Sequence, residues 1–391
     1  MTEAPMYDQN AAILTIDLDA IAANYRLLQQ QVSRAICGAA VKADGYGLGA
    51  IQVAPALYRA GCRDFFVATL DEGLVLREVV GRDARVFILN GLAAGNVELM
   101  LRVGLTPVLN GPRDAEVWAG WNWQSSDGPP PAVLQLDTGM SRLGFGAADL
   151  ERLLASDFLD RFPLALVISH LGCADDPAAT MNVRQLTTFR ARIAALKGRL
   201  TTAPQWSLAA SSGIFLGSDF HFDLVRPGAA LYGINPLPGR PNPLCPVLRL
   251  QAKILQVHDV DAGTLVGYGA THKCAHPTRI ATIGCGYADG LFRALSSQGA
   301  VHVGDYRAPI VGRASMDLLS IDVGAVPPDL ARPGLTVDII GPHQDVDSLA
   351  RNAATIGYEV LTGIGPRFHR IYQGGMTVAG PVTTGPAEAH S

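Results

Sequence analysis

Ala39-Ala40-Val41-Lys42-Ala43-Asp44-Gly45-Tyr46-Gly47-Leu48-Gly49-Ala50 is the most informative stretch of this chain. It sets one lysine at the end of an apolar run and follows it with three glycines within five residues. A lysine at the end of a buried strand faces a protein-lined cavity, where desolvation lowers the pKa of its amine and frees it to attack an aldehyde, giving a Schiff base. The glycines allow the backbone to bend closely around a ligand, and Tyr46 supplies a hydroxyl suited to a phosphate oxygen.

Short β-branched runs alternate with longer helix-patterned stretches from Arg34 to Gly233, which is typical of βα units around a parallel sheet. Helical patterns include 71–80 and 178–200. The eight expected strands are 35–42, 64–69, 86–90, 106–110, 132–137, 164–170, 205–210 and 223–231. Eight units predict an α/β fold, a (β/α)8 TIM barrel with its active site at the carboxyl ends of the strands. A doubly wound open sheet is the alternative, but no GxGxxG follows the first strand.

Five prolines crowd the segment between Asn235 and Val247, which indicates a linker. The runs that follow are short and separated by Gly, Asp and Pro: 248–257, 278–283, 300–303, 308–311, 318–323 and 336–340. They predict a mainly antiparallel β domain, either a barrel or a sandwich. We therefore expect the TIM barrel over residues 12–240, with the strand 12–18 joining the C-terminal domain, the β domain over 241–380, and a flexible tail over 381–391.

Composition argues for an ordinary globular enzyme, with 48% apolar and 17% charged residues. The net charge is −4 and no basic stripe occurs, so no nucleic-acid partner is expected. The six cysteines are scattered without CxxC spacing, so neither a metal site nor a disulfide framework is predicted. Because the first residues lack signal-peptide features and no apolar run approaches membrane-spanning length, the sequence predicts a cytoplasmic protein with no membrane contact.

Five further motifs accompany the lysine stretch. They are Asp137-Thr138-Gly139-Met140-Ser141-Arg142-Leu143-Gly144, Arg226-Pro227-Gly228-Ala229-Ala230-Leu231-Tyr232-Gly233, Gly267-Tyr268-Gly269, Gly286-Tyr287-Ala288-Asp289-Gly290 and Gly312-Arg313-Ala314-Ser315-Met316-Asp317. Each alone is weak, because glycine-rich turns are common in barrels. Together and in this order, from Ile16-Asp17-Leu18 to Arg370-Ile371-Tyr372, they resemble the alanine racemases, which are pyridoxal-phosphate enzymes.

The resemblance implies that Lys42 carries pyridoxal 5'-phosphate and then acts as a base on one face of it. Tyr268 matches the base on the opposite face, and the family's architecture implies that it comes from the second subunit of a head-to-tail homodimer. A racemase removes a proton from one side of a planar carbanion and returns one from the other, so two flanking groups satisfy the chemistry.

The resemblance also implies a set of binding residues. Arg226 matches the arginine at the pyridine nitrogen; because guanidinium keeps its proton, the ring nitrogen stays unprotonated and racemisation is favoured over transamination. The remaining cofactor-binding residues are Tyr46, His170, Ser211, Ser212, Gly228, Ala229 and Tyr232. The substrate-binding residues are Arg142, Tyr287, Met316 and Asp317.

Two positions depart from the family pattern. Gln135 stands where many members have a carbamylated lysine whose negative charge fixes the arginine. We expect a bound anion such as chloride between Gln135 and Arg142 in its place. Pro366 stands where some members have a tyrosine that contacts the phosphate and gates the channel, so the entrance must differ there.

The function that the resemblance implies is interconversion of L-alanine and D-alanine, to supply D-alanine for peptidoglycan or to serve alanine catabolism. The first alternative is a broad-specificity amino-acid racemase of the same fold. The second is a fold-related decarboxylase, which uses a glutamate at the ring nitrogen and a cysteine in trans; Arg226 and Tyr268 argue against it. A pyridoxal-phosphate carrier protein would lack the β domain.

Overall fold

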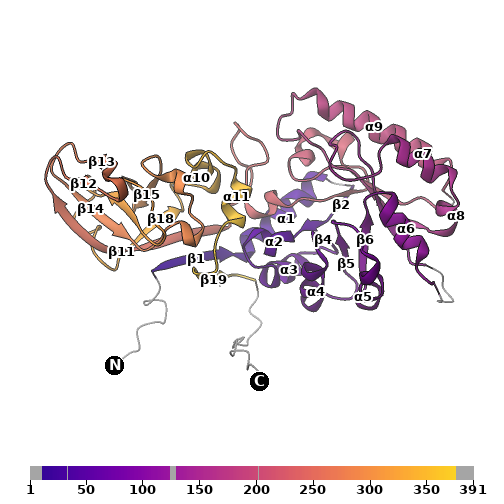
Figure 1. The fold of residues 1–391 in the computed structure, drawn as a ribbon, viewed down its shortest axis with the longest axis horizontal. Coiled ribbons are helices and arrows are strands. Elements are labelled where there is room, and N and C mark those ends of the chain that lie inside the picture. Colours follow the sequence, from indigo (N-terminus) through magenta and orange to yellow (C-terminus); the bar gives the residue numbers. More distant parts are fainter. Residues whose placement is uncertain (1–10, 33, 124–128, 201, 376–391) are drawn as a thin grey trace, which may run out of the picture.

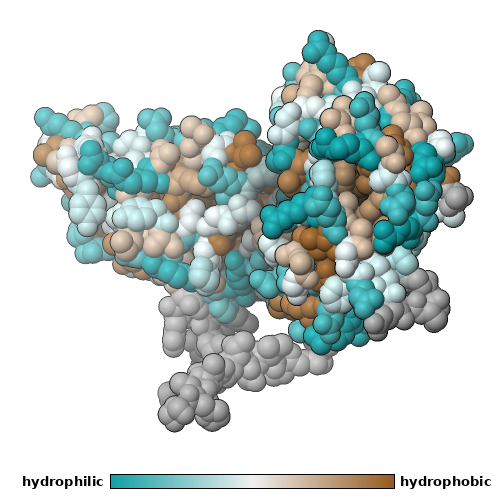
Figure 2. All heavy atoms as spheres, turned by 45° about the vertical axis from the view of Figure 1, so that its right-hand side comes forward, coloured by the Kyte–Doolittle hydropathy of each residue, from teal (hydrophilic) through white to brown (hydrophobic). Residues whose placement is uncertain are grey.

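The computed structural model describes residues 11–32, 34–123, 129–200 and 202–375 and divides the chain into two lobes (Figure 1). One lobe holds parallel strands surrounded by helices, and the other holds a mainly antiparallel sheet. Figure 2 shows the lobes side by side, with apolar residues gathered in the middle of one face of the barrel lobe and hydrophilic residues around them. The predicted fold class is confirmed.

Seven strands of the first lobe run parallel and lie side by side in the order of the sequence. They are β3 (Ala39–Ala40), β4 (Asp64–Val67), β5 (Arg85–Ile88), β6 (Leu105–Leu109), β7 (Ala132–Gln135), β8 (Leu164–Ile168) and β9 (Gln205–Ser207). The circle is completed by β2 (Ile36–Cys37) and β10 (Leu224–Val225), which pair in parallel. The Gly38 N–H donates to the Val225 carbonyl (2.9 Å), and the Arg226 N–H donates to the Ala209 carbonyl (3.0 Å).

The first and eighth strands differ from the expectation. The first is interrupted at Gly38, where a β-carbon would lie 2.9 Å from the Phe66 ring, and it ends at Ala40. The eighth ends at Val225, so the prediction of strand to residue 231 was wrong. Pro227 has no N–H to continue a ladder, and Ala229–Tyr232 form a 3-10 turn, η5, instead. Irregular backbone therefore surrounds the carboxyl end of the barrel.

Helices cover the outside of the barrel (Figure 1). They are α1 (Leu18–Val32), α3 (Ala50–Arg59), α4 (Leu70–Val79), α5 (Val97–Val103), α6 (Pro112–Gly120), α7 (Ala147–Ala155), α8 (Phe158–Arg161) and α9 (Thr180–Lys197). α4 begins where Thr69 and Glu72 form a reciprocal capping box, which satisfies N–H groups that the first helical turn leaves free. α4 and α9 match the predicted helices within three residues at each end.

The sheet of the second lobe is built around the long strand β11 (Leu248–Val260). Its other members are β1 (Ala12–Asp17), β14 (Thr278–Ile283), β15 (Ala300–Val303), β16 (Tyr306–Pro309), β17 (Leu319–Asp322), β18 (Thr336–Ile340) and β19 (His369–Gln373). β1 lies antiparallel to β11 and parallel to β19, so the first strand belongs to the sheet of the last residues. A hairpin of β12 (Leu265–Val266) and β13 (His272–Lys273) and the helices α10 (Val346–Asn352) and α11 (Gly357–Thr362) complete the lobe. The expected tail, 381–391, lies outside the described residues.

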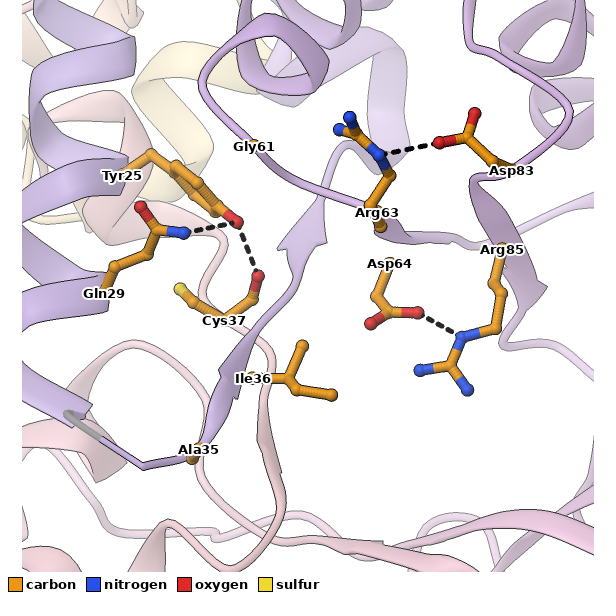
Figure 3. Close-up of a pocket in the computed structure, with 10 residues that line it drawn as sticks. All are labelled: Tyr25, Gln29, Ala35, Ile36, Cys37, Gly61, Arg63, Asp64, Asp83 and Arg85. Carbon is orange, nitrogen blue, oxygen red and sulfur yellow. Dashed lines mark hydrogen bonds and ion pairs between the residues drawn. The ribbon is translucent and has the colours of Figure 1, made fainter.

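A cavity of about 590 Å³ opens at the amino ends of the barrel strands (Figure 3). The charged side chains that line it form ion pairs with one another, Arg63 with Asp83 at 2.8 Å and Arg85 with Asp64 at 2.5 Å. The polar constellation described next lies at the opposite, carboxyl ends, as it does in TIM-barrel enzymes. In the described part of the chain, no helix is long and apolar enough to cross a membrane.

Candidate active site

Lys42 begins a left-handed turn, α2 (Lys42–Tyr46), directly after β3. Ala43, Asp44 and Tyr46 have φ values of 52°, 53° and 55°, a region that costs a residue with a β-carbon about 1 kcal/mol or more. The strain is held by contacts with the rest of the chain, including a bond from Arg370 Nη1 to the Gly47 carbonyl (2.7 Å). The turn therefore fixes where the side chain of Lys42 starts.

The environment of the Lys42 amine favours its uncharged form. Burial lowers the pKa of Lys42, and the positive charge of Arg142 lowers it further, while Glu72 opposes the shift. A lower pKa leaves more free amine at neutral pH, which is what attack on an aldehyde requires. This agrees with the sequence-based interpretation of Lys42.

His170 follows β8 and is neutral at any working pH. Burial lowers its pKa to about 3, and the charges of Arg226, Arg142 and Lys42 act in the same direction. A neutral imidazole among three cations offers a flat ring and one lone pair, so His170 can pack against a ligand but cannot act as an acid near pH 7.

Arg226 is buried at the centre of the barrel mouth. Its guanidinium donates to the Ser207 hydroxyl and to the carbonyls of Ser169 and Leu208. Burial lowers its pKa to about 10, so it keeps its charge at neutral pH. No carboxylate pairs with Arg226 among the described residues. The three acceptors that hold Arg226 are neutral, so its buried charge has no counter-charge among the described residues, and the guanidinium can bind a ligand that offers a lone pair or a negative charge.

Two tyrosines and a glycine loop form a second part of the site. The rings of Tyr46 and Tyr232 stack with centroids 4.6 Å apart, and the Tyr232 hydroxyl donates to the Ala40 carbonyl at 3.1 Å. Ser211 Oγ accepts the N–H groups of Gly228 (3.0 Å) and Ala230 (3.1 Å). The Gly228 amide predicted to bind phosphate is therefore engaged by Ser211, which leaves Ser211 as a support of this loop.

Gly228 is required where it stands, because a β-carbon there would overlap the Tyr46 hydroxyl. Gly228→Ala is expected to destabilise the protein by about 1–3 kcal/mol, the usual cost of overpacking, because Tyr46 must leave Tyr232. Urea unfolding followed by circular dichroism measures the loss. Gly120→Ala is the matched control, since nothing lies within 4 Å of a β-carbon at that helix end; an equal loss in both variants would contradict this account.

Gln135, Arg142 and His170 line a small recess at the ends of β7 and β8. Gln135 is buried and donates to the Leu143 carbonyl at 3.4 Å, while Ser141 has a positive φ of 56° that turns the chain before Arg142. A neutral amide and a guanidinium thus lie in one closely packed part of the barrel mouth.

The predicted residues of the second lobe form a group of their own. Tyr268, Met316 and Tyr287 are 72%, 54% and 42% exposed. Their motifs interlock: the Ala288 N–H donates to the Met316 carbonyl at 2.9 Å, and the Gly267 and Gly312 backbones are in close contact. Arg367 binds Asp317 at 2.7 Å and the buried Asp289 at 2.9 Å, which ties two of the motifs together.

The structure does not bring Tyr268 to Lys42 within one chain. β12 and β13, which flank Tyr268, lie at the far end of the second lobe from α2 (Figure 1). The barrel residues Lys42, Tyr46, His170, Ser211, Ser212, Arg226, Gly228, Ala229 and Tyr232 gather at one end of the first lobe. Within one chain, therefore, Tyr268 lies apart from Lys42, and its exposed ring can contact another molecule.

Sequence reasoning missed four residues that contact the predicted site residues or their turns: Glu72, Ser207, Tyr358 and Arg367. Tyr358 of α11 packs near Tyr46, with ring centroids 6.2 Å apart. Glu72 had a detectable signal, since Thr69-x-x-Glu72 before an apolar run is the capping-box pattern. The other three gave none, because each acts through a contact between distant parts of the chain.

Comparison with known proteins identifies the family of this chain. Residues 16–236 match the N-terminal domain of alanine racemase, and residues 247–372 match its C-terminal domain. The chain is 46% identical to an alanine racemase of Brucella abortus, over 92% of this chain and 93% of that protein. It is also 46% identical to a catabolic alanine racemase of Mesorhizobium japonicum, over 93% of this chain and 94% of that protein. The crystal structure of alanine racemase from Bartonella henselae, with covalently bound pyridoxal phosphate, superimposes with a TM-score of 0.88 at 41% identity, covering 93% of this chain and 99% of that one. The chain therefore belongs to the alanine racemase family of isomerases.

Proposed function

We propose that this protein interconverts L-alanine and D-alanine with pyridoxal 5'-phosphate, using Lys42 on one face of the substrate and Tyr268 of a second subunit on the other. The observation that carries the proposal is the barrel mouth, where the half-buried amine of Lys42, with a lowered pKa, and the buried Arg226 both lie close enough to His170 to lower its pKa. Membership of the family and the cofactor bound by the Bartonella relative support the assignment.

The residues present fit pyridoxal phosphate. Lys42 would hold it covalently, Arg226 would donate to its ring nitrogen, and His170 would pack against its ring. Tyr46, Ser212 and the Ala229 amide would take its phosphate, while Tyr232 and Ser211 hold Tyr46 and the Gly228 loop in place. When bound, the cofactor supplies an electron sink for the electron pair left at the α-carbon.

The chain's own groups then move the proton. The amine of Lys42 takes or returns a proton on one face of the α-carbon, and the phenol of Tyr268 does so on the other. Because β12 and β13, which flank Tyr268, lie far from α2 in the same chain and Tyr268 is 72% exposed, we assign it to the active site of a partner in a homodimer. The Met316 N–H and Arg142 would bind the substrate carboxylate, with Asp317 and Tyr287 supporting that side of the pocket.

The direct test follows D-alanine formation. The full-length chain with pyridoxal phosphate should produce D-alanine from L-alanine until the two are equal, measured with a D-amino-acid oxidase assay. Rates on serine and lysine distinguish the narrow enzyme from a broad-specificity racemase. Carbon dioxide release from an amino acid, with no D-enantiomer formed, would instead identify a decarboxylase.

We further propose that an anion binds between Gln135 and Arg142, because a neutral amide cannot fix the guanidinium electrostatically. These side chains pack closely, so they must move apart to admit the anion. Crystals grown with bromide should show an anomalous peak there, and activity should rise with added chloride. Gln135→Glu supplies the charge within the chain and should abolish the chloride dependence. Water alone at this position, together with halide-independent wild-type activity, would contradict the proposal.

Two physiological roles fit this reaction in the cytoplasm. Supply of D-alanine for peptidoglycan predicts that cells lacking the protein need added D-alanine, whereas catabolism predicts poor growth on alanine as carbon source.

At the entrance of the active site, Pro366 has no hydroxyl with which to contact a phosphate. Tyr358, which packs near Tyr46 from α11, would line this side instead.

A further inference from the structure

The Glu72 carboxylate makes two contacts beyond the capping box. Oε2 accepts the Thr69 N–H (3.3 Å), which is the capping-box bond, and also the Ala68 N–H (2.7 Å); both residues belong to the loop between β4 and α4. Oε1 reaches across to the N–H of Ala43, at 2.7 Å, in a different βα unit. One carboxylate therefore joins the loop after β4 to the residue that follows Lys42.

The position of this bridge matters because of the backbone that it holds. Ala43, directly after Lys42, is the first residue of the turn with a positive φ, at 52°, and its conformation sets the path of the backbone that leaves Lys42. An N–H bound to a carboxylate is held more strongly than one bound to a neutral acceptor. Release of the Ala43 N–H would let the strained turn relax.

We propose that Glu72 is a positioning residue for Lys42: its carboxylate clamps the turn after the lysine to the loop after β4 and places one negative charge opposite the amine. The proposal rests on the function assigned above to Lys42. The charged and titratable groups facing Lys42 are Arg142 from the loop after β7, His170 after β8, and Glu72 from α4. Glu72 is the one anion of these three, so the direction in which its removal changes the pKa of Lys42 can be predicted.

Glu72→Gln tests the charge. The full-length chain is freed of pyridoxal phosphate with hydroxylamine, and the labelling of Lys42 by an amine-reactive reagent is measured by mass spectrometry across pH, with exposed Lys197 as internal reference. Loss of the anion should move the labelling midpoint of Lys42 down by about half a pH unit or more. A variant that only loosens the structure would expose the amine and move the midpoint up, so the sign separates the two roles.

Two further variants complete the experiment. Glu78→Gln makes the same chemical change at an exposed position of the same helix and should leave the midpoint unchanged. Glu72→Asp keeps the charge but is too short to bridge both loops. It should keep the wild-type midpoint while slowing covalent capture of pyridoxal phosphate, followed by absorbance, about tenfold.

Three results would overturn the proposal: an unmoved midpoint in Glu72→Gln, an upward shift in that variant, or wild-type capture rates in Glu72→Asp. None of these measurements needs an amino-acid substrate. If the wild-type chain fails to racemise alanine while the midpoint of Glu72→Gln still falls, the proposed function is wrong and the positioning role stands.

Discussion

Replacement of Lys42 by alanine is expected to abolish both cofactor attachment and racemisation. The variant loses the only amine at the end of β3 and the base on one face of the substrate, so activity should fall by about 10,000-fold or more, since a positioned base alone contributes about 100- to 10,000-fold. The absorbance band of covalently attached pyridoxal phosphate should disappear, and borohydride treatment should no longer fix the cofactor to the chain.

Lys197→Ala is the control, because it removes an exposed lysine from α9 and should change neither racemisation nor cofactor attachment. If borohydride still fixed the cofactor in Lys42→Ala, another lysine would be the attachment site. The assignment of the barrel mouth would then be wrong.

Tyr268→Phe is expected to slow racemisation by about 100- to 10,000-fold while leaving cofactor attachment intact, because it removes one proton donor and acceptor. The equilibrium between the enantiomers is fixed, so kcat/KM must fall equally in both directions. The two enantiomers should instead differ in how fast their α-proton exchanges with solvent. In deuterium oxide, one enantiomer alone should keep exchanging its α-proton without inversion, through Lys42, as measured by nuclear magnetic resonance. Tyr306→Phe, at a half-exposed tyrosine of β16, should behave as wild type.

Mixing the two inactive chains tests the shared site. A dimer of one Lys42→Ala chain and one Tyr268→Phe chain holds one complete site only if each site takes its lysine and its tyrosine from different subunits. Random exchange should then restore about a quarter of wild-type activity. No recovery, with mixed dimers shown by mass spectrometry, would mean that Tyr268 acts elsewhere.

The βα units and the residues at the ends of their strands could be predicted from the sequence, because both depend on short stretches of neighbouring residues. Apolar periodicity marked β4 to β9, and Lys42, His170 and Arg226 fell at strand ends where a barrel brings them together. The end of the eighth strand was missed because the apolar run continues to Leu231 and only Pro227 signals the stop. Ser207 and Arg367 were missed because their roles depend on Arg226 and Asp289, which lie far from them in the chain.

The left-handed turn at Lys42 is another feature that local sequence could not fully predict. A lysine followed by spaced glycines predicted a tight bend, but not that Ala43, Asp44 and Tyr46 would all take positive φ values. That conformation is unfavourable locally and persists because Glu72, Arg370 and α11 surround it.

The place of β1 has a consequence for biosynthesis. Its residues, Ala12–Asp17, are synthesised long before their partners, which are β11 (Leu248–Val260) and β19 (His369–Gln373). At about 5 to 20 residues per second, the first strand waits tens of seconds for its neighbours. The barrel can close during this delay, whereas β1 is an apolar strand with unpaired edges and remains able to bind chaperones and other nascent chains. Completion of the second lobe is thus a late event of translation, and mutations in β19 should reveal themselves first as poor yield of folded protein.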